Sequence, residues 1–227
     1  MFGRREKSAS ESCEPAYLRP YAEVARRVGA RFEALLWQNA EGQQRRFDVL
    51  AEMLAPEDRA MADLGCGRAD LLVHLHGIGR TPRRYVGVDG IAAMVEAARQ
   101  QIAASALREA SVLQADFVAD PGCFAELVRA HGVDTLVFSG SLNTLEQHQA
   151  ERVLERAFAA LPSGGALAFN FLSDLYPAAR ASEQGPAFRF STLGMLAWAL
   201  RRTPLVRFRH DYLGGHDATI AMFRPSD

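Results

Sequence analysis

The sequence predicts an α/β protein with a doubly wound, Rossmann-like sheet of seven mostly parallel strands. Two observations carry this prediction. Short apolar runs alternate with helical patterns along most of the chain, which is typical of right-handed βαβ units whose parallel sheet is covered by helices on both faces. The last two runs are joined only by a short turn that contains Gly214 and Gly215, so they predict an antiparallel C-terminal hairpin.

Helical patterns fill the intervals between the apolar runs. Apolar residues at helical spacing begin at Ile91. Asp120 and Pro121 are a typical helix start, with an end at Gly132, and a further helix is expected over residues 146–161. The predicted strands, in chain order, are residues 61–64, 85–88, 111–114, 134–138, 166–171, 205–208 and 219–223.

The chain before the first strand is polar at its start and then helical. Two apolar stripes have helical spacing, one from Tyr21 to Leu36 and one from Phe47 to Leu54. The polar start lacks the hydrophobicity that folding needs. We therefore expect a disordered tail, a cap of two N-terminal helices and a main domain, at residues 1–15, 16–57 and 58–227.

The composition excludes several classes of function. Of the 227 residues, 48% are hydrophobic and 23% are charged, so the chain can bury a core. With 26 basic and 27 acidic residues the formal charge is −1, which argues against extensive binding of a phosphate backbone. Lys7, in the polar tail, is the one lysine of the sequence. Schiff-base chemistry and a lysine-containing phosphate loop are therefore excluded.

The cysteines and the apolar runs indicate a cytoplasmic protein. Cys13, Cys66 and Cys123 are scattered, without the spacing of a disulfide framework or a metal site. No apolar run approaches the roughly 18–20 residues of a membrane span, and the start has no apolar signal core. We expect neither a metal nor a membrane partner.

Three features follow successive predicted strands. Gly65 and Gly67 come after the first strand, Asp89 ends the second, and Asp116 stands beside Phe117 after the third. In a parallel sheet these positions converge on one crevice, where glycines let the backbone approach a ligand and a carboxylate can accept ribose hydroxyls. The alternative is that the two carboxylates only stabilise turns.

The segments MADLGCGRAD, YVGVDG and LQADF resemble the successive motifs of class I S-adenosylmethionine-dependent methyltransferases, and the resemblance covers roughly residues 58–225. It implies S-adenosyl-L-methionine as cofactor and S-adenosyl-L-homocysteine as product. Ala69 replaces the third glycine of the first motif, and we expect binding to survive because alanine is small. By resemblance, Asp63, Gly65 and Gly67 line the methionine part, Asp89 the ribose, Asp116 and Phe117 the adenine, and Ser139 and Gly140 lie near the sulfonium. Cys66 and Gly90 are further candidates for cofactor binding.

A nicotinamide or flavin dinucleotide is the rival cofactor. Its fingerprint needs glycine or alanine at the last position of G-x-G-x-x-G, where this chain has Asp70. A carboxylate there would repel a pyrophosphate at the helix N-terminus. A sulfonium cofactor has no phosphate, so the sequence favours S-adenosylmethionine.

Two residues of the cap are further candidates for the cofactor site. Trp37 lies where the two predicted helices join, and it can close over the methyl group. Arg46 can pair with the carboxylate of the cofactor. The alternatives are a core tryptophan and a solvated arginine.

Catalytic residues stay unknown at this stage. Methyl transfer from a sulfonium needs alignment and exclusion of water, and it needs a base only when the acceptor holds its proton. His210, Asn143 and Tyr212 are candidates, although Asn143 has an alternative role as the cap of the next helix. The two His-Asp pairs around the last turn, which begin at His210 and His216, are not expected to bind a metal, because we expect the hairpin at the sheet edge, away from the crevice.

We expect the methyl acceptor to be a small molecule, methylated on oxygen or nitrogen. The loop after the fourth predicted strand, SGSLNT, lacks the Pro-Pro run that similar nucleic-acid amino-methyltransferases carry there, so we expect no nucleic-acid partner. Two alternatives stay open. One is an RNA or protein methyltransferase that uses the surface from Arg201 to Arg209, and the other is a protein that binds the cofactor without turnover.

Overall fold

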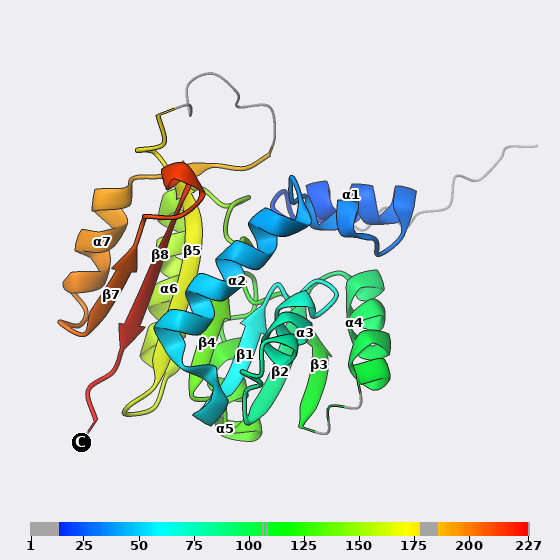
Figure 1. Cartoon of the computed structure of the whole chain (residues 1–227), viewed down its shortest axis with the longest axis horizontal. Coiled ribbons are helices and arrows are strands. Elements are labelled where there is room, and N and C mark those ends of the chain that lie inside the picture. The colour runs from blue at the N-terminus through cyan, green and yellow to red at the C-terminus, as the bar shows by residue number, and fades with distance from the viewer. Residues whose placement is uncertain (1–13, 106, 108, 178–185, 227) are drawn as a thin grey trace, which may run out of the picture.

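The computed structural model describes residues 14–105, 107, 109–177 and 186–226. Its centre is a single β-sheet (Figure 1). The predicted disordered tail lies almost wholly outside these residues. The strands are β1 (Ala60–Leu64), β2 (Arg84–Asp89), β3 (Ala110–Gln114), β4 (Thr135–Phe138), β5 (Ala166–Ser173), β6 (Arg189–Phe190), β7 (Val206–Arg209) and β8 (Asp217–Phe223). Seven of them follow the order β3-β2-β1-β4-β5-β8-β7, and β6 pairs with β5.

The strand directions confirm the predicted fold class. The pairs β1–β2, β1–β4, β2–β3 and β4–β5 are parallel, whereas β8 is antiparallel to both β5 and β7. The short strand β6 runs parallel to the carboxyl end of β5. It was not predicted, because two residues are too few to form an alternating pattern.

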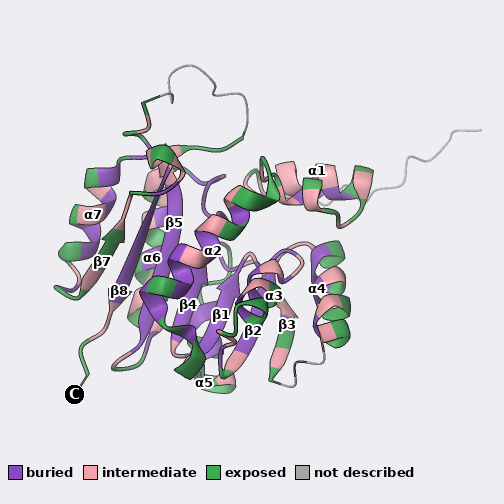
Figure 2. Cartoon of the chain, in the orientation of Figure 1, coloured by how far each residue is buried: buried purple, intermediate pink, exposed green. Residues whose placement is uncertain are grey.

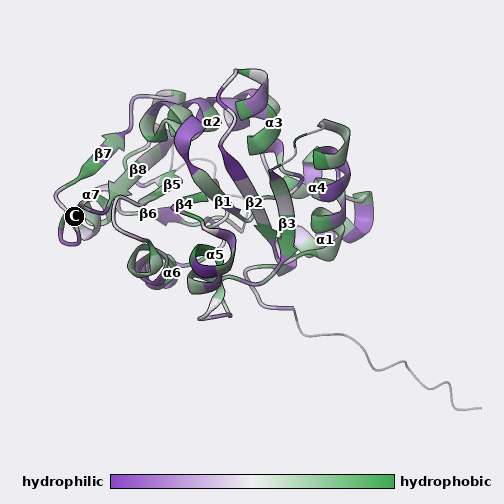
Figure 3. Cartoon of the chain, turned by 90° about the horizontal axis from the view of Figure 1, so that it is seen from below, coloured by the Kyte–Doolittle hydropathy of each residue, from purple (hydrophilic) through white to green (hydrophobic). Residues whose placement is uncertain are grey.

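Helices cover both faces of the sheet (Figure 3). The helices α2, α3 and α4 pack on one face, and α5, α6 and α7 pack on the other. The central strands β1 and β4 are buried at every position, as expected for parallel strands covered on both sides (Figure 2). The helices are α1 (Arg19–Val28), α2 (Ala40–Leu54), α3 (Asp70–Gly77), α4 (Ala92–Ser105), α5 (Cys123–His131), α6 (Gln147–Ala160) and α7 (Thr192–Leu200), with 3-10 turns η1 (Phe32–Leu35), η2 (Pro56–Asp58) and η3 (Leu213–Gly215).

The first apolar stripe forms a helix and a separate turn, not one helix. α1 ends at Val28 because Gly29 has a φ of 75°, which ends the helical geometry. The turn η1 follows, and α1 and η1 contact α4 through a small cluster that includes Ala25, Ala34 and Met94. This N-terminal segment lies over the carboxyl ends of the parallel strands (Figure 1).

The C-terminal hairpin lies at one lateral edge of the sheet, as predicted. β7 is the edge strand, but β8 is inserted between β7 and β5. β8 begins at Asp217, and Leu172 near the carboxyl end of β5 pairs with this residue. The hairpin turn therefore lies at the carboxyl ends of the parallel strands, on the same side as the loops after β1, β2, β3 and β4. His210, Tyr212 and His216 at this turn nevertheless line neither of the two cavities at that end of the sheet, which agrees with the expected position outside the crevice.

Candidate functional site

The loop after β1 requires glycine at two positions. Gly65 and Gly67 have φ values of 77° and 54°, in the left-handed region that glycine tolerates. A Cβ on Gly65 would overlap Ser141, and a Cβ on Gly67 would lie 2.5 Å from Cδ2 of Leu35. Ala69 also has a positive φ, 64°, and it is the N-cap residue of α3. The loop thus accommodates one methyl group at the third motif position.

Asp89 connects the end of β2 to this glycine loop. Its carboxylate accepts one hydrogen bond from the backbone N–H of Gly67 and one from that of Ile91, both at 2.9 Å. The residue is 8% exposed. Burial raises the pKa of this carboxyl to about 6, although the two backbone hydrogen bonds lower it.

Asp63, at the end of β1, is the second buried carboxylate of the site. The hydroxyl of Tyr85 donates a hydrogen bond to it at 2.8 Å. Burial, with smaller contributions from the carboxylates of Asp89 and Asp70, raises the pKa of Asp63 to about 7. A cation near Asp63 would favour the charged form of this carboxyl.

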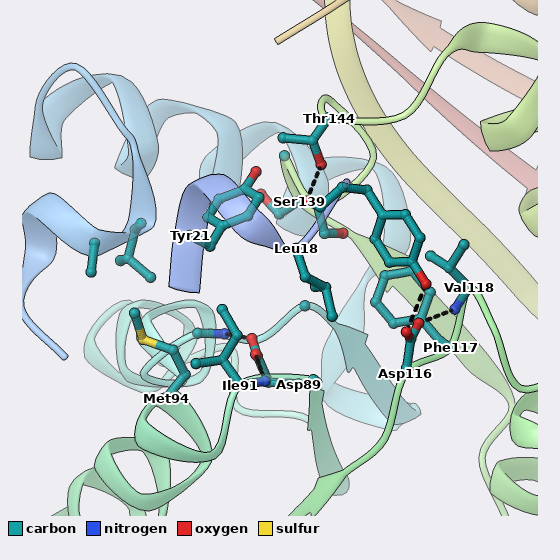
Figure 4. A pocket seen from close by; sticks show the side chains of 18 of the residues that line it. Leu18, Tyr21, Asp89, Ile91, Met94, Asp116, Phe117, Val118, Ser139 and Thr144 are labelled. Carbon is teal, nitrogen blue, oxygen red and sulfur yellow. Dashed lines mark hydrogen bonds between the residues drawn. The ribbon is translucent and has the colours of Figure 1, made fainter. Parts of the chain in front are cut away.

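Asp116 faces the N-terminal segment (Figure 4). The hydroxyl of Tyr17 donates a 2.6 Å hydrogen bond to Oδ2 of Asp116. The other carboxylate oxygen accepts hydrogen bonds from the backbone N–H groups of Val118 and Ala119, which fixes the loop after β3. The ring of Phe117, beside it, lines the same cavity.

Two adjoining cavities occupy the carboxyl edge of the sheet, with volumes of about 710 Å³ and about 280 Å³. Arg46 lines neither cavity. The other residues predicted to bind the cofactor line one cavity or both: Asp89, Gly90, Asp116, Phe117 and Gly140 line the larger one, Asp63 and Cys66 the smaller one, and Trp37, Gly65, Gly67 and Ser139 both. The structure therefore brings these predicted residues into one continuous site.

Comparison with known proteins points to the same region of the chain. The sequence pattern of a methyltransferase domain matches residues 61–165. Similar solved structures include an O-methyltransferase family protein from Burkholderia thailandensis, with 18% identity and a TM-score of 0.63 over 81% of this chain and 56% of that chain. Magnesium protoporphyrin IX methyltransferase from Synechocystis PCC 6803 has 12% identity and a TM-score of 0.64 over 96% of this chain and 100% of that chain.

A small RNA methyltransferase is also similar, with 15% identity and a TM-score of 0.64 over 81% of this chain and 25% of that chain. None of the curated proteins matches the chain. The domain match covers the loops after β1 to β4, which form the site. The domain match and the shared fold together support a class I S-adenosylmethionine-dependent methyltransferase. Its cofactor is S-adenosylmethionine.

The site of this methyltransferase fits its cofactor. Gly65 and Gly67 let Ser141 and Leu35 approach the loop after β1, and both glycines line the two cavities. The buried hydroxyl of Ser141, in the wall of the larger cavity, has no hydrogen-bond partner among the described residues. The charged side chains in the two linings are carboxylates, which suits a sulfonium and does not suit a pyrophosphate.

The N-terminal segment, part of the predicted cap, forms a roof over the site, and several of the residues that line the cavity from it were not among the predicted site residues. Tyr17, Leu18, Tyr21 and Leu35 line the larger cavity. Figure 4 shows Leu18 and Tyr21 across the cavity from Asp89 and Ile91. The hydroxyl of Thr144, from the loop after β4, donates a hydrogen bond to the backbone carbonyl of Tyr17 at 2.9 Å. Tyr17 lies before the start of α1, so helical spacing could not have marked it as a residue of the site.

The three catalytic candidates lie outside both linings. His210 Nε2 is 2.9 Å from the hydroxyl of Ser173, and the hydroxyl of Tyr212 is 2.6 Å from that of Thr219. Burial raises the pKa of Tyr212. Asn143 is buried, and its Oδ1 has no partner among the described residues. Their catalytic roles stay predictions.

Asn143 does not cap the helix that follows it. Glu146 and Gln149 form a reciprocal capping box at the start of α6, so the alternative role considered for Asn143 is wrong. The described residues also hold no group of three His, Cys, Asp or Glu side chains suited to a metal ion. No helix in the described ranges is long and apolar enough to cross a membrane.

Arg46 and Trp37 form a separate arrangement beside the cavities. Arg46 is 7% exposed, so the interpretation as a solvated arginine is wrong. Its guanidinium forms a bidentate pair with Asp217, at 2.7 and 2.6 Å, and the prediction that it binds the cofactor carboxylate is not supported by this placement. The guanidinium also stacks on the indole of Trp37, with Cζ 4.6 Å from the ring centroid.

Proposed function

We propose that this methyltransferase acts on oxygen or nitrogen of a small, neutral or cationic acceptor. The observation that carries the proposal is the charge of the roofed site. Among the described residues, Asp63, Asp70, Asp89 and Asp116 line the cavities, whereas no arginine, lysine or histidine does. An anionic acceptor would find no counterion there, and its transfer from water would be costly.

The chain's residues have positioning roles in this proposal. S-adenosylmethionine supplies an activated methyl group on a sulfonium. Asp89 accepts hydrogen bonds from the ribose hydroxyls, and Asp116 accepts one from the adenine amino group. Asp63 lies on the methionine side. The roof formed by Tyr17, Tyr21 and neighbouring residues excludes water, so the reaction depends mainly on alignment.

The arginine surface argues against RNA as the acceptor. Arg202 pairs with Glu155, and Arg209 pairs with both Glu52 and Asp211. Carboxylates thus neutralise part of the positive charge that a phosphate backbone would need.

Arg207 is also engaged within the protein. It donates to the backbone carbonyl of Met53 and stacks on the ring of Phe223. The surface from Arg201 to Arg209 therefore supports the fold at these positions and presents less free charge than the sequence suggests.

The test is methyl transfer from S-adenosylmethionine with a labelled methyl group. The protein is incubated with three sets of acceptors: phenols and amines, carboxylic acids, and total cellular RNA at low and high salt. We expect labelled product from phenols or amines. Asp89→Ala should abolish it, whereas Asp58→Ala, on the exposed turn η2, should not.

Labelled RNA, or labelled acids without labelled phenols or amines, would contradict the proposed acceptor class. If the cofactor binds in a calorimeter but small molecules and cell extracts yield no labelled product, the protein binds S-adenosylmethionine without turnover.

A further inference from the structure

A buried ion pair connects the C-terminal hairpin to α2. Asp217, the first residue of β8, has 0% exposure, and both of its carboxylate oxygens accept hydrogen bonds from Arg46. Nδ1 of His216 lies 2.6 Å from the same carboxylate. The remaining guanidinium nitrogen of Arg46 donates to the backbone carbonyl of Gly42 at 2.8 Å. All three guanidinium nitrogens are therefore engaged, and Arg46 is held in one orientation.

This fixed guanidinium lies against the indole of Trp37. The 4.6 Å separation between Cζ and the ring centroid is within the range of a cation–π contact. The six-membered ring of the indole lies against the loop after β4, where a Cβ on Gly140 would overlap it. Trp37 is thus held between the ion pair and the glycine of the cofactor site.

Trp37 lines both cavities, together with Leu35, Gly65, Gly67 and Ser139. A cofactor that extends from the Asp116 side to the Asp63 side must pass this indole. The orientation of Trp37 therefore affects the shape of the whole site, although Arg46 and Asp217 lie outside both linings.

We propose that Arg46 and Asp217 are positioning residues, which hold the Trp37 indole as a wall of the cofactor site. They act on ligand binding through Trp37 and touch no ligand themselves. A buried ion pair is weak evidence for stability alone, since an apolar pair of similar volume often serves as well. An apolar pair could not make the cation–π contact with Trp37, so this contact explains why the pair is charged.

The experiment measures binding of S-adenosylhomocysteine by calorimetry. Arg46→Met alone leaves Asp217 without its main counterion and risks unfolding, so the principal variant is Arg46→Met/Asp217→Asn, which removes both charges. Arg46→Lys keeps the charge but loses the planar, bidentate geometry. Arg45→Met is the matched control, because Arg45 is the preceding residue of α2 and its ion pairs are exposed.

We expect the double variant to bind about tenfold more weakly, because binding must then order an indole that the ion pair no longer holds in place. Arg46→Lys should not restore binding, and Arg45→Met should bind like the wild type. In a Trp37→Phe background, the same double substitution should change affinity by less than about twofold, because the transmitting ring is gone.

A spectroscopic readout separates positioning from general stability. The sequence has two tryptophans, so Trp198→Phe leaves Trp37 as the single reporter. We expect the double variant to shift Trp37 emission and increase its quenching by iodide while circular dichroism stays unchanged. Unchanged affinity in the folded double variant, or an equal loss with and without Trp37, would overturn the proposal. Failure of the wild type to bind would instead contradict the cofactor assignment.

Discussion

At the scale of single residues, the two buried carboxylates make cofactor binding depend on pH. Burial raises the pKa of Asp63 to about 7 and that of Asp89 to about 6. Ribose hydroxyls and a cationic cofactor favour the charged forms, so binding should release protons in this range. For each carboxylate that must lose its proton, we expect affinity for S-adenosylmethionine to increase by up to about tenfold per pH unit between about pH 5 and about pH 7.

Calorimetry in buffers of different ionisation enthalpy measures this proton release. Asp63→Asn should flatten the upper part of the profile, and a profile that stays steep above about pH 6 in this variant would assign the titration to another group. The stability of the unliganded protein depends on pH in the opposite direction. Both pKa values lie above the unfolded value of about 4, so the unfolding free energy falls as the pH rises through about 7.

The placement of residues around the cavities was predictable where it follows from the local sequence, as for Asp63, Asp89 and Asp116 at the carboxyl ends of their strands. It was not predictable where the partner is distant in the chain. Arg46 and Asp217 are separated by 171 positions, and no spacing links them. Tyr17 meets Asp116 across 99 positions for the same reason.

At the scale of elements, the loop after β4 and the segment between η1 and α2 are complementary at one point. Gly140 has a φ of 71° and would overlap Trp37 if it carried a Cβ. Gly79 has nearly the same φ, 72°, with nothing within 4 Å of the added Cβ, so it is a matched control. Alanine at either position costs about 1–2 kcal/mol of unfolding free energy through the backbone.

Only Gly140→Ala should also displace the indole, and we expect it to weaken S-adenosylhomocysteine binding by at least about tenfold. Chemical denaturation and calorimetry on both variants check this. If Gly79→Ala weakens binding as much, the effect comes from backbone strain and not from Trp37.

Element types were predictable because the apolar periodicities are strong in β1 to β5 and in α4 and α6. The prediction of the elements was incomplete where a local signal interrupts an apolar stripe or where contacts between distant segments decide the arrangement. Gly29 ends α1 within a continuous apolar stripe. The position of the hairpin turn depends on the insertion of β8 beside β5, which turn residues alone do not specify.

At the scale of the whole molecule, the cofactor site lies between the sheet and a segment that is weakly attached to it. α1 and η1 contact α4 through a small cluster of their own, separate from the clusters that hold the sheet. Tyr17 adds a hydrogen bond to Asp116 and Thr144 adds one to Tyr17. Few buried apolar contacts imply a low free energy of local opening.

Because a bound cofactor would contact both the sheet and this roof, binding should suppress that opening. We expect the backbone amides of α1 to exchange hydrogen rapidly without ligand and much more slowly with S-adenosylhomocysteine, while those of α6, remote from the cavities, change little. At a concentration a hundredfold above Kd, the unfolding free energy should rise by about 2.7 kcal/mol. Equal slowing in both helices would indicate only this global stabilisation, and unchanged exchange in α1 would show that the roof does not close on the ligand.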